Sequence, residues 1–348
     1  MKNNYDRKIL VFAQEAGSAA LLIPVIERLS SYGYTAEIHA LPPALHLFKA
    51  RFDCVNEWTG FPDEKFDLLL AGYGNPRVPV NSNFFAEARR FGVNKSIALL
   101  DNWRGLDRFF DKNGNASTNM PSIIAVMDSE TEDYLIRKGI PADKLVVTGH
   151  PGLEILSTHT ITMKDRIAAR EKLNLPIDKM IYFLASEIIH NHSYHEPCDL
   201  EGNKCFSLFN IKVDNVSLWR NIVSKYDKDD TLFILKAHPN EKHKITDELR
   251  IIEWEDFDEI DIINAVDVVF GLASMFVLIS VAAGIETYNV QPFLSAWMPQ
   301  NSFMSTDLWT HLTLNGYLGE LGNIKAARQD HTGALNRVLN AIEENLRI

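Results

Sequence analysis

The feature that most restricts the fold of this chain is a series of short, continuous apolar runs, each followed by turn residues. KILVF at 8–12 and MIYFLA at 180–185 are two examples. Apolar residues that do not alternate with polar ones indicate that both faces of a strand are buried, as in a parallel sheet between helix layers. Segments with helical spacing separate the runs, so the sequence predicts repeated strand–helix–strand units.

The predicted strands fall into two series. They are 8–12, 36–40, 66–71, 96–100, 122–127 and 145–148, then 180–185, 231–236, 267–270 and 290–294. Helices are expected at 19–29, 84–91, 130–138, 218–226 and 332–346. A chain of 348 residues is long enough for two domains. We therefore expect an α/β fold with two Rossmann-like domains and a ligand cleft between them.

Charge and cysteine content restrict the partners and the compartment. The formal net charge is -11, and no run of Lys and Arg forms a basic patch, so no nucleic-acid partner is expected. Three cysteines and an N-terminus without a signal-peptide pattern predict a reduced, cytoplasmic location. The uncharged stretch 268–285 is interpreted as a buried strand, a turn and a buried helix, not as a membrane span.

In the first series, polar residues follow the strands, where doubly wound sheets bind ligands. Gly17 and Ser18 can present backbone N–H groups to a phosphate or sugar, or simply form a tight turn. Asp101 is a candidate general base, the alternative being a helix cap or an ion pair, and Glu15 is the competing base. His150 is a further candidate for substrate binding.

The second series places another set of polar residues at strand ends. Lys236 can supply a charge to a diphosphate, and His238 can donate to phosphate or sugar oxygens, or pack as a structural histidine. Ser274 and Met275 begin the predicted buried helix, where a phosphate or a plain N-cap is expected, and Ser186 follows the first strand of this series.

One segment, HNHSYHEPCDLEGNKC at 190–205, concentrates metal-ligand residue types. They are His190, His192, His195, Glu196, Cys198 and Cys205. Their spacing matches no zinc motif, and we expect a solvated loop, no metal and no cofactor.

Four segments resemble the GT-B glycosyltransferase superfamily. VVTGHPGLE at 146–154 is similar to the domain-linking segment of GT-B enzymes, including UDP-N-acetylglucosamine 2-epimerases, and the strand–helix–strand before it looks like theirs. LKAHPNEKH at 235–243 resembles a K-x-HP stretch of bacterial capsule and teichoic acid transferases. GLASMFVLISVAAGI at 271–285 resembles the helix that binds the donor nucleotide.

The resemblance implies two domains facing each other and a C-terminal helix that returns to the first. The expected boundaries are 1–155 for the acceptor domain, 156–328 for the nucleotide-donor domain and 329–348 for the returning helix. Members often carry a Glu on the donor helix that binds the ribose, whereas Ser280 stands there in this chain, and we do not expect Glu286 to replace it. Either the ribose is held differently, or the donor is unusual, or transfer activity is lost.

The resulting hypothesis is transfer of a hexosyl group from a nucleotide-sugar donor to a hydroxyl acceptor in bacterial surface polysaccharide or glycan synthesis. The acceptor would be a glycan or a lipid-linked molecule, which leaves room for peripheral membrane association; the oligomeric state stays open. One alternative is a nucleotide-sugar 2-epimerase or hydrolase, with Glu15, Asp101, Asp128 and Glu130 as its carboxylates. The other is a non-catalytic GT-B-like binding protein, for which Ser280 is the best sequence argument.

Overall fold

The computed structural model describes residues 7–73, 83–101, 109–110, 115–117, 119–186, 215–236, 250–251, 259–271, 275–289 and 331–347. The chain divides into two compact units. Met1–Ile155 together with Asp330–Ile348 form unit 1, and Leu156–Gln329 form unit 2.

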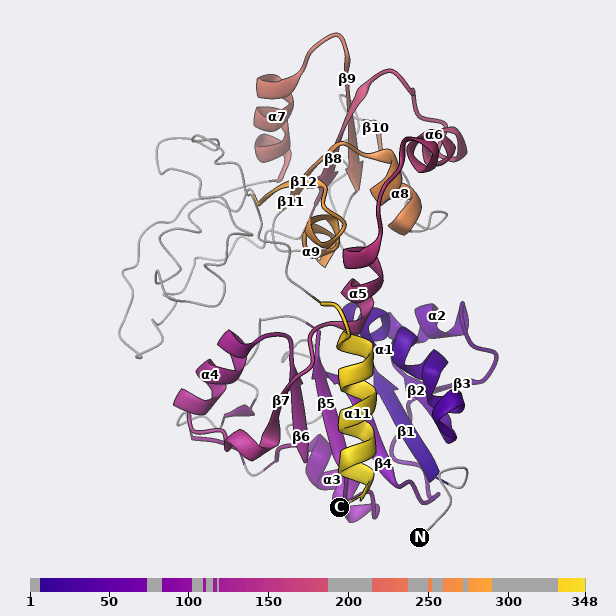
Figure 1. Cartoon of the computed structure of the whole chain (residues 1–348), viewed down its shortest axis with the longest axis vertical. Coiled ribbons are helices and arrows are strands. Elements are labelled where there is room, and N and C mark those ends of the chain that lie inside the picture. Colours follow the sequence, from indigo (N-terminus) through magenta and orange to yellow (C-terminus); the bar gives the residue numbers. More distant parts are fainter. Residues whose placement is uncertain are drawn as a thin grey trace. The chain divides into compact units, whose positions relative to one another are not determined.

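Within the described residues, unit 1 is built on a seven-stranded parallel sheet with the order β3-β2-β1-β4-β5-β6-β7 (Figure 1). The strands are β1 (Arg7–Ala13), β2 (Tyr34–Ala40), β3 (Val55–Glu57), β4 (Leu68–Tyr73), β5 (Ser96–Leu100), β6 (Ile123–Val126) and β7 (Leu145–Val147). Every residue of β5 is buried, as expected for a strand that has helices on both faces.

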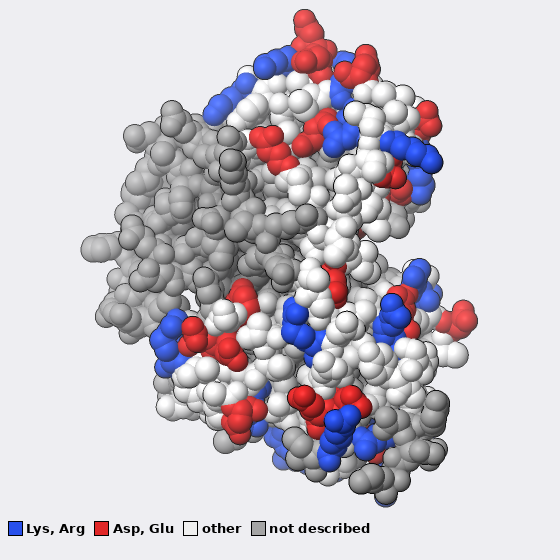
Figure 2. Space-filling model, viewed as in Figure 1, with Lys and Arg blue, Asp and Glu red and all other residues white. Residues whose placement is uncertain are grey.

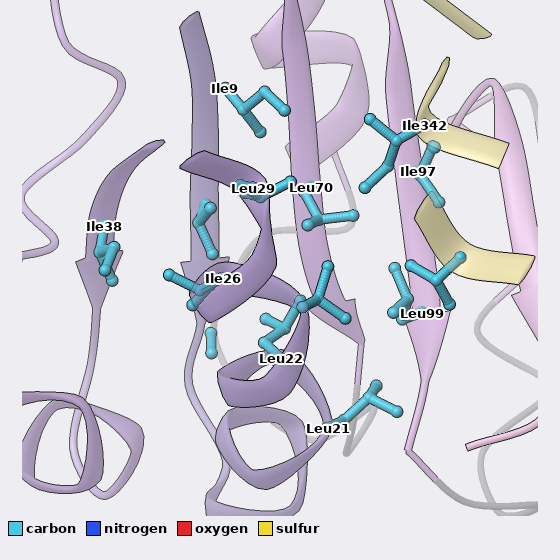
Figure 3. Packing of buried hydrophobic residues seen from close by; sticks show 14 of the residues in the cluster. Ile9, Leu21, Leu22, Ile26, Leu29, Ile38, Leu70, Ile97, Leu99 and Ile342 are labelled. Atoms are coloured by element: carbon cyan, nitrogen blue, oxygen red, sulfur yellow. The ribbon is translucent and has the colours of Figure 1, made fainter. Parts of the chain in front are cut away.

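Helices α1 (Ala16–Leu29), α2 (Ala44–Lys49), α3 (Phe84–Arg90), α4 (Ser129–Arg137), α5 (Pro151–Thr158) and α11 (Ala334–Arg347) belong to the first sheet, α5 running across the boundary into unit 2. One face packs on α1, α2 and α11. Figure 3 shows Leu22 of α1 and Ile342 of α11 over the strand residues Leu70 and Ile97. The residues that alternate with these along the strands pack instead with Phe84 and Phe85 of α3. The continuous apolar runs thus supply both cores.

Unit 2 contains a second parallel sheet, with the order β10-β9-β8-β11-β12 among the described residues. The strands are β8 (Met180–Ala185), β9 (Thr231–Lys236), β10 (Arg250–Ile251), β11 (Val268–Gly271) and β12 (Glu286–Asn289). The helices are α6 (Met163–Lys172), α7 (Asn215–Tyr226), α8 (Glu259–Ala265) and α9 (Met275–Ala282).

One face of the second sheet carries a row of aromatic rings, one from each of four neighbouring strands. Phe233, Tyr182, Phe270 and Tyr288 follow one another with ring centroids 5.1, 5.9 and 5.2 Å apart and nearly parallel planes. The same cluster includes the fully buried Trp219 of α7. Since aromatic pairs across strands stabilise a sheet beyond their area of contact, this row helps to fix the order of the four strands.

The structure confirms the predicted fold class: two Rossmann-like α/β units and a C-terminal helix that returns to the first of them. Strand β12 at Glu286–Asn289 was not predicted; its β-branched Thr287 and aromatic Tyr288 suit a strand that pairs with β11. The predicted strand at 290–294 lies outside the described ranges. Four short elements, α2, β3, β10 and α8, were not predicted, since runs this short carry little periodicity.

Acidic and basic side chains are interspersed over the face shown in Figure 2, where the described residues form no extended basic surface. Within the described ranges, no helix combines the length and the apolar character that crossing a bilayer requires.

Candidate functional sites

Each sheet has one point where the strand order reverses, and this is where doubly wound folds form ligand crevices, outside the carboxyl ends of the strands. In unit 1 the point lies between β1 and β4, and in unit 2 it lies between β8 and β11. Polar groups at the carboxyl ends of these strands and their neighbours are therefore the candidate ligand contacts of each unit.

In unit 1, Asp101 and Ser18 meet at this edge. Ser18 Oγ donates a hydrogen bond of 3.1 Å to Asp101 Oδ2, and the two residues are 0% and 3% exposed. Asp101 directly follows β5, and Ser18 lies in the first turn of α1. Gly72, the residue before the last of β4, makes this contact possible, because a Cβ there would lie 2.7 Å from Ser18 Cβ. A desolvated carboxylate with an oriented hydroxyl neighbour is a suitable general base.

The turn after β1 is shorter than predicted, since α1 already begins at Ala16. Glu15 is the N-cap residue in an extended conformation, and its side chain makes no capping hydrogen bond. Gly17 therefore lies inside the first helical turn. The candidates Glu15, Gly17 and Ser18 thus share the N-terminal end of α1, which favours anions.

His150 lies elsewhere in unit 1, in the seam between α5 and α11. Its backbone N–H donates to His331 Nδ1 at 3.2 Å, and its own Nδ1 accepts from the Leu153 N–H at 3.2 Å. Burial, reinforced by His331, lowers the pKa of the His150 imidazole to about 3. The ring is therefore neutral with its proton on Nε2, which is buried and has no hydrogen-bond partner among the described residues. The sequence-based proposal that His150 binds substrate stays a proposal.

In unit 2, Ser186 and Lys236 lie side by side at the ends of β8 and β9. The Ser186 N–H donates to the Lys236 carbonyl at 2.9 Å. Trp219 Nε1 of α7 donates to Ser186 Oγ at 3.4 Å, which orients the hydroxyl. Lys236 Nζ lies 5.9 Å from the Phe276 ring centroid, and burial lowers the pKa of this ammonium to about 8, opposed by the charge of Glu259. Lys236 can thus present a desolvated positive charge to an anion.

The start of α9 also lies at the carboxyl edge of the second sheet, after β11. Met275 is the first residue of α9. Gly271 ends β11, and a Cβ at that position would overlap the Val277 side chain of α9, so the glycine lets this helix pack closely on the sheet. His238 and Ser274 lie outside the described ranges, as does the His- and Cys-rich segment 190–205.

Other polar groups have structural partners. Asp128 caps α4, accepting from the Thr131 N–H and hydroxyl at 2.7 Å each. Among the described residues, no three His, Cys, Asp or Glu side chains come together as metal ligands. A cavity of about 340 Å³ in unit 2 includes Asp267 and Glu286 in its lining. These two residues lie at the amino ends of β11 and β12, the edge opposite to Lys236.

The sequence did not reveal the residues that support these sites. The role of Gly72 and Gly271 had one sequence signal, a glycine that ends an apolar strand. Trp219 and Phe276 had none, because each lies on a helix far along the chain from its neighbour, Ser186 for Trp219 and Lys236 for Phe276.

Comparison with known proteins identified the fold. No protein-family model matches the chain, and no curated protein matches its sequence. A UDP-N-acetylglucosamine 2-epimerase from Rickettsia bellii is 13% identical with a TM-score of 0.62, and the match covers 98% of this chain and 97% of that one. HepE from Anabaena, solved with UDP and glucose, is 12% identical with a TM-score of 0.58 over 98% and 99% of the two chains. The wall teichoic acid polymerase TagF is 12% identical with a TM-score of 0.57, and the match covers 99% of this chain and 90% of that one.

The chain has the GT-B fold. Matches of nearly full length to several solved structures show this fold, which the resemblance in the sequence implied. A polymerase and an epimerase are both among the similar GT-B structures. Their sequence identities to this chain, 12% and 13%, show that the fold is shared and nothing more. The choice between these activities therefore depends on the sites of this chain.

Proposed function

We propose that this protein is a glycosyltransferase that moves a hexosyl group from a nucleotide-sugar donor to a hydroxyl acceptor. The observation that carries the proposal is the division of chemistry between the two units. Unit 1 holds a candidate base, Asp101, and unit 2 holds a buried cation, Lys236. A transfer reaction has two substrates: an acceptor that must be deprotonated, and a donor whose leaving diphosphate must be stabilised. The base of unit 1 suits the acceptor, and the cation of unit 2 suits the donor.

In this mechanism, unit 2 binds the donor and unit 1 binds the acceptor. Asp101, or Glu15 in its place, takes the proton of the acceptor hydroxyl as its oxygen attacks the anomeric carbon of the sugar. The bond from that carbon to the diphosphate oxygen breaks. The charge that develops on the diphosphate is met by Lys236, by backbone N–H groups at the start of α9 and by His238 and Ser274, so no cofactor is needed. His150 and Ser186 are proposed to contact the substrates.

The biological setting is part of the proposal. The solved structures of similar fold include a wall teichoic acid polymerase and a protein solved with UDP and glucose. These structurally similar proteins support a role in bacterial surface polysaccharide or glycan synthesis, with a glycan or lipid-linked acceptor. We propose a cytoplasmic location, with peripheral membrane association where the acceptor is lipid-linked.

A second candidate is epimerisation or hydrolysis of the nucleotide-sugar itself. The similarity to UDP-N-acetylglucosamine 2-epimerases favours it, since those matches are as extensive as the others. Of its expected carboxylates, however, Asp128 already accepts two hydrogen bonds as a helix cap. The Glu130 side chain lies outside the described residues. Among the described candidates, Glu15 and Asp101 remain at the carboxyl edge of unit 1, a small set for acid–base chemistry on a sugar ring.

The test uses the purified full-length protein with UDP-, GDP- and CMP-sugars. We expect thermal stabilisation by at least one donor, and a glycosylated product only when a hydroxyl acceptor is present. Epimerised or hydrolysed sugar without acceptor would favour the second candidate, and binding without turnover across a broad acceptor set would favour a binding protein. Absence of stabilisation by any nucleotide or nucleotide-sugar would remove the proposal.

A further inference from the structure

The hydroxyl of Ser18 serves Asp101 and does not cap its own helix. Glu15 is the N-cap residue of α1, and Ser18 is the third residue of the helix, beyond the capping position. A serine hydroxyl has one hydrogen to donate. Ser18 Oγ donates it to Asp101 Oδ2, across 83 residues of chain. Helix formation does not require a serine here, since alanine would favour the helix more.

The first sheet is shaped to allow this contact. Ile97 and Leu99 of β5 belong to the core that includes α1, and Asp101, two residues further on, emerges on the same face. Gly72 of β4 is paired with Leu99. A Cβ on Gly72 would lie 2.7 Å from Ser18 Cβ and 3.0 Å from the Ser18 carbonyl oxygen. The glycine therefore lets α1 bring the hydroxyl close to the end of β5.

The contact is a costly way to hold α1 on the sheet. Ser18 and Asp101 are both buried, and a carboxylate that leaves water loses hydration that its new hydrogen bonds only partly replace. An apolar pair of similar size would join the helix to the sheet without that loss. Buried carboxylates gather at functional sites, where a fixed donor keeps a reacting group in one orientation.

From this geometry we infer that Ser18 is the positioning residue for Asp101 in the transfer reaction. The inference rests on the proposed function and deepens it. Ser18 holds Oδ2, so Oδ1 is the oxygen that takes the acceptor proton as the acceptor oxygen attacks the sugar. The hydrogen bond survives this step, because Oδ2 can accept in the carboxylate and in the acid. Ser18 itself is fully buried and does not touch the substrates, unlike the ligand contact expected from the sequence.

The test compares rate with binding in the full-length protein, using the nucleotide-sugar and the hydroxyl acceptor that give product in the assay of the proposed function. Ser18→Ala is expected to lower kcat roughly 10- to 100-fold, the effect of removing one donor from a charged group. The acceptor KM and the dissociation constant of the released nucleotide should change less than about twofold, because Ser18 contacts neither. A raised KM at unchanged kcat would make Ser18 a substrate contact and overturn the inference.

A double-mutant cycle with Asp101→Asn separates positioning from any other role. Once the base is gone, Ser18 has nothing to position, so Ser18→Ala should slow the Asp101→Asn variant by less than about threefold. Losses that multiply would show that Ser18 acts independently, and the inference would be wrong. If kcat falls in Asp101→Asn but not in Ser18→Ala, the inference fails and the proposed function stands. If no nucleotide-sugar and acceptor give product, the proposed function fails and the inference fails with it.

Two further variants guard against a simple loss of structure. Ser96→Ala is the matched control, because Ser96 is also buried and its Oγ accepts from the Ser122 N–H at 3.0 Å, but it lies at the other end of β5. Its kcat should stay within about twofold of the wild type. A loss as large as that of Ser18→Ala would overturn the inference.

Ser18→Cys keeps the shape of the side chain and a weak donor, so an intermediate kcat is expected. This variant takes the place of Ser18→Ala in the cycle if the alanine variant does not fold, with the same outcomes. Thermal denaturation shows which variants are folded before rates are compared.

Discussion

At the scale of single residues, the two proposed sites differ in how burial acts on charge. Asp101 is 3% exposed and receives a hydrogen bond from Ser18, so its carboxylate exchanges water for a fixed donor. Lys236 is packed against the Phe276 ring, and desolvation shifts its proton equilibrium toward the neutral amine.

Asp101→Asn is expected to lower kcat by roughly 10²–10⁴-fold while nucleotide affinity stays unchanged, since Asn can accept the Ser18 hydrogen bond but cannot take a proton. Initial rates and titration calorimetry measure the two quantities. Asp128→Asn is the matched control, because Asn caps a helix as well as Asp does. Equal loss of rate in both variants would contradict the assignment of Asp101 as the base and would favour a reaction that uses several carboxylates.

Nucleoside diphosphate affinity is expected to fall as pH rises through about 8, where Lys236 loses its charge. The sign follows from the direction of the shift: burial lowers the pKa from 10.5, so the charged form predominates below about 8 and the neutral form above it. Titrations from about pH 7 to about pH 9.5 measure the effect. Lys236→Met should remove this pH dependence, and Lys228→Met, an exposed lysine before β9, should retain it. An unchanged profile in Lys236→Met would contradict the role of this ammonium.

At the scale of elements, the amino end of the second sheet is held by a buried ion pair. Arg170 of α6 donates to Asp267 Oδ2 at 2.7 Å and to the carbonyls of Ala265 and Ile177 at 2.8 Å each. Asp267 also accepts from the Ile181 N–H at 2.7 Å and from Arg166. This network joins α6 to the first residues of β8 and β11 and so fixes the helix against the sheet.

Arg170→Met is expected to lower the free energy of unfolding by about 3–5 kcal/mol, because it leaves buried oxygen atoms without their donor. Lys172→Met on the same helix is the control. Lys172 forms an ion pair with Asp261, but its side chain is 60% exposed, so its loss should cost under about 1 kcal/mol. Urea denaturation measures both variants. A loss of similar size in the two would show that the Arg170 network does not hold this part of the sheet.

At the scale of the whole molecule, the last helix completes the core of the first unit. The apolar residues of α11, among them Val338 and Ile342, are buried with α1 and the first sheet. Its N-terminal end is fixed by Glu154, whose carboxylate accepts from the Gly333 and Leu335 N–H groups at 2.6 and 2.7 Å. At the other end, the Leu346 carbonyl accepts from Arg7 at 2.7 Å. Both contacts suit the helix dipole.

Ile342→Ala is expected to destabilise unit 1 by about 2–5 kcal/mol, since the residue is 0% exposed in the core that contains β1. Hydrogen exchange should show faster opening of β1 and β4 and unchanged protection of β8 and β9 in unit 2. The exposed Glu344→Ala in the same helix should have no such effect. Equal loss of protection in both units would contradict the placement of α11.

Much of the fold follows from local sequence. The strands at 96–100, 180–185 and 231–236 were predicted to the residue, because burial on both faces requires continuous apolar runs. The candidate sites were predicted as strand ends, since parallel strands place all their carboxyl ends at one edge. Which of these side chains meet was not predictable. His150 and Asp101 both follow strands of one sheet, yet one lies in a helix seam and the other contacts Ser18.

The sequence by itself determined where the longer strands and helices form and that the sheets are parallel, because these depend on apolar patterns within a few residues of one another. The tertiary structure decided which strands are neighbours and which side chains touch. Ser18 and Asp101 are 83 residues apart, and Arg170 and Asp267 are 97 apart. No local pattern encodes such contacts, since they arise only when helices of fixed length pack on a sheet whose strand order is set by the whole core.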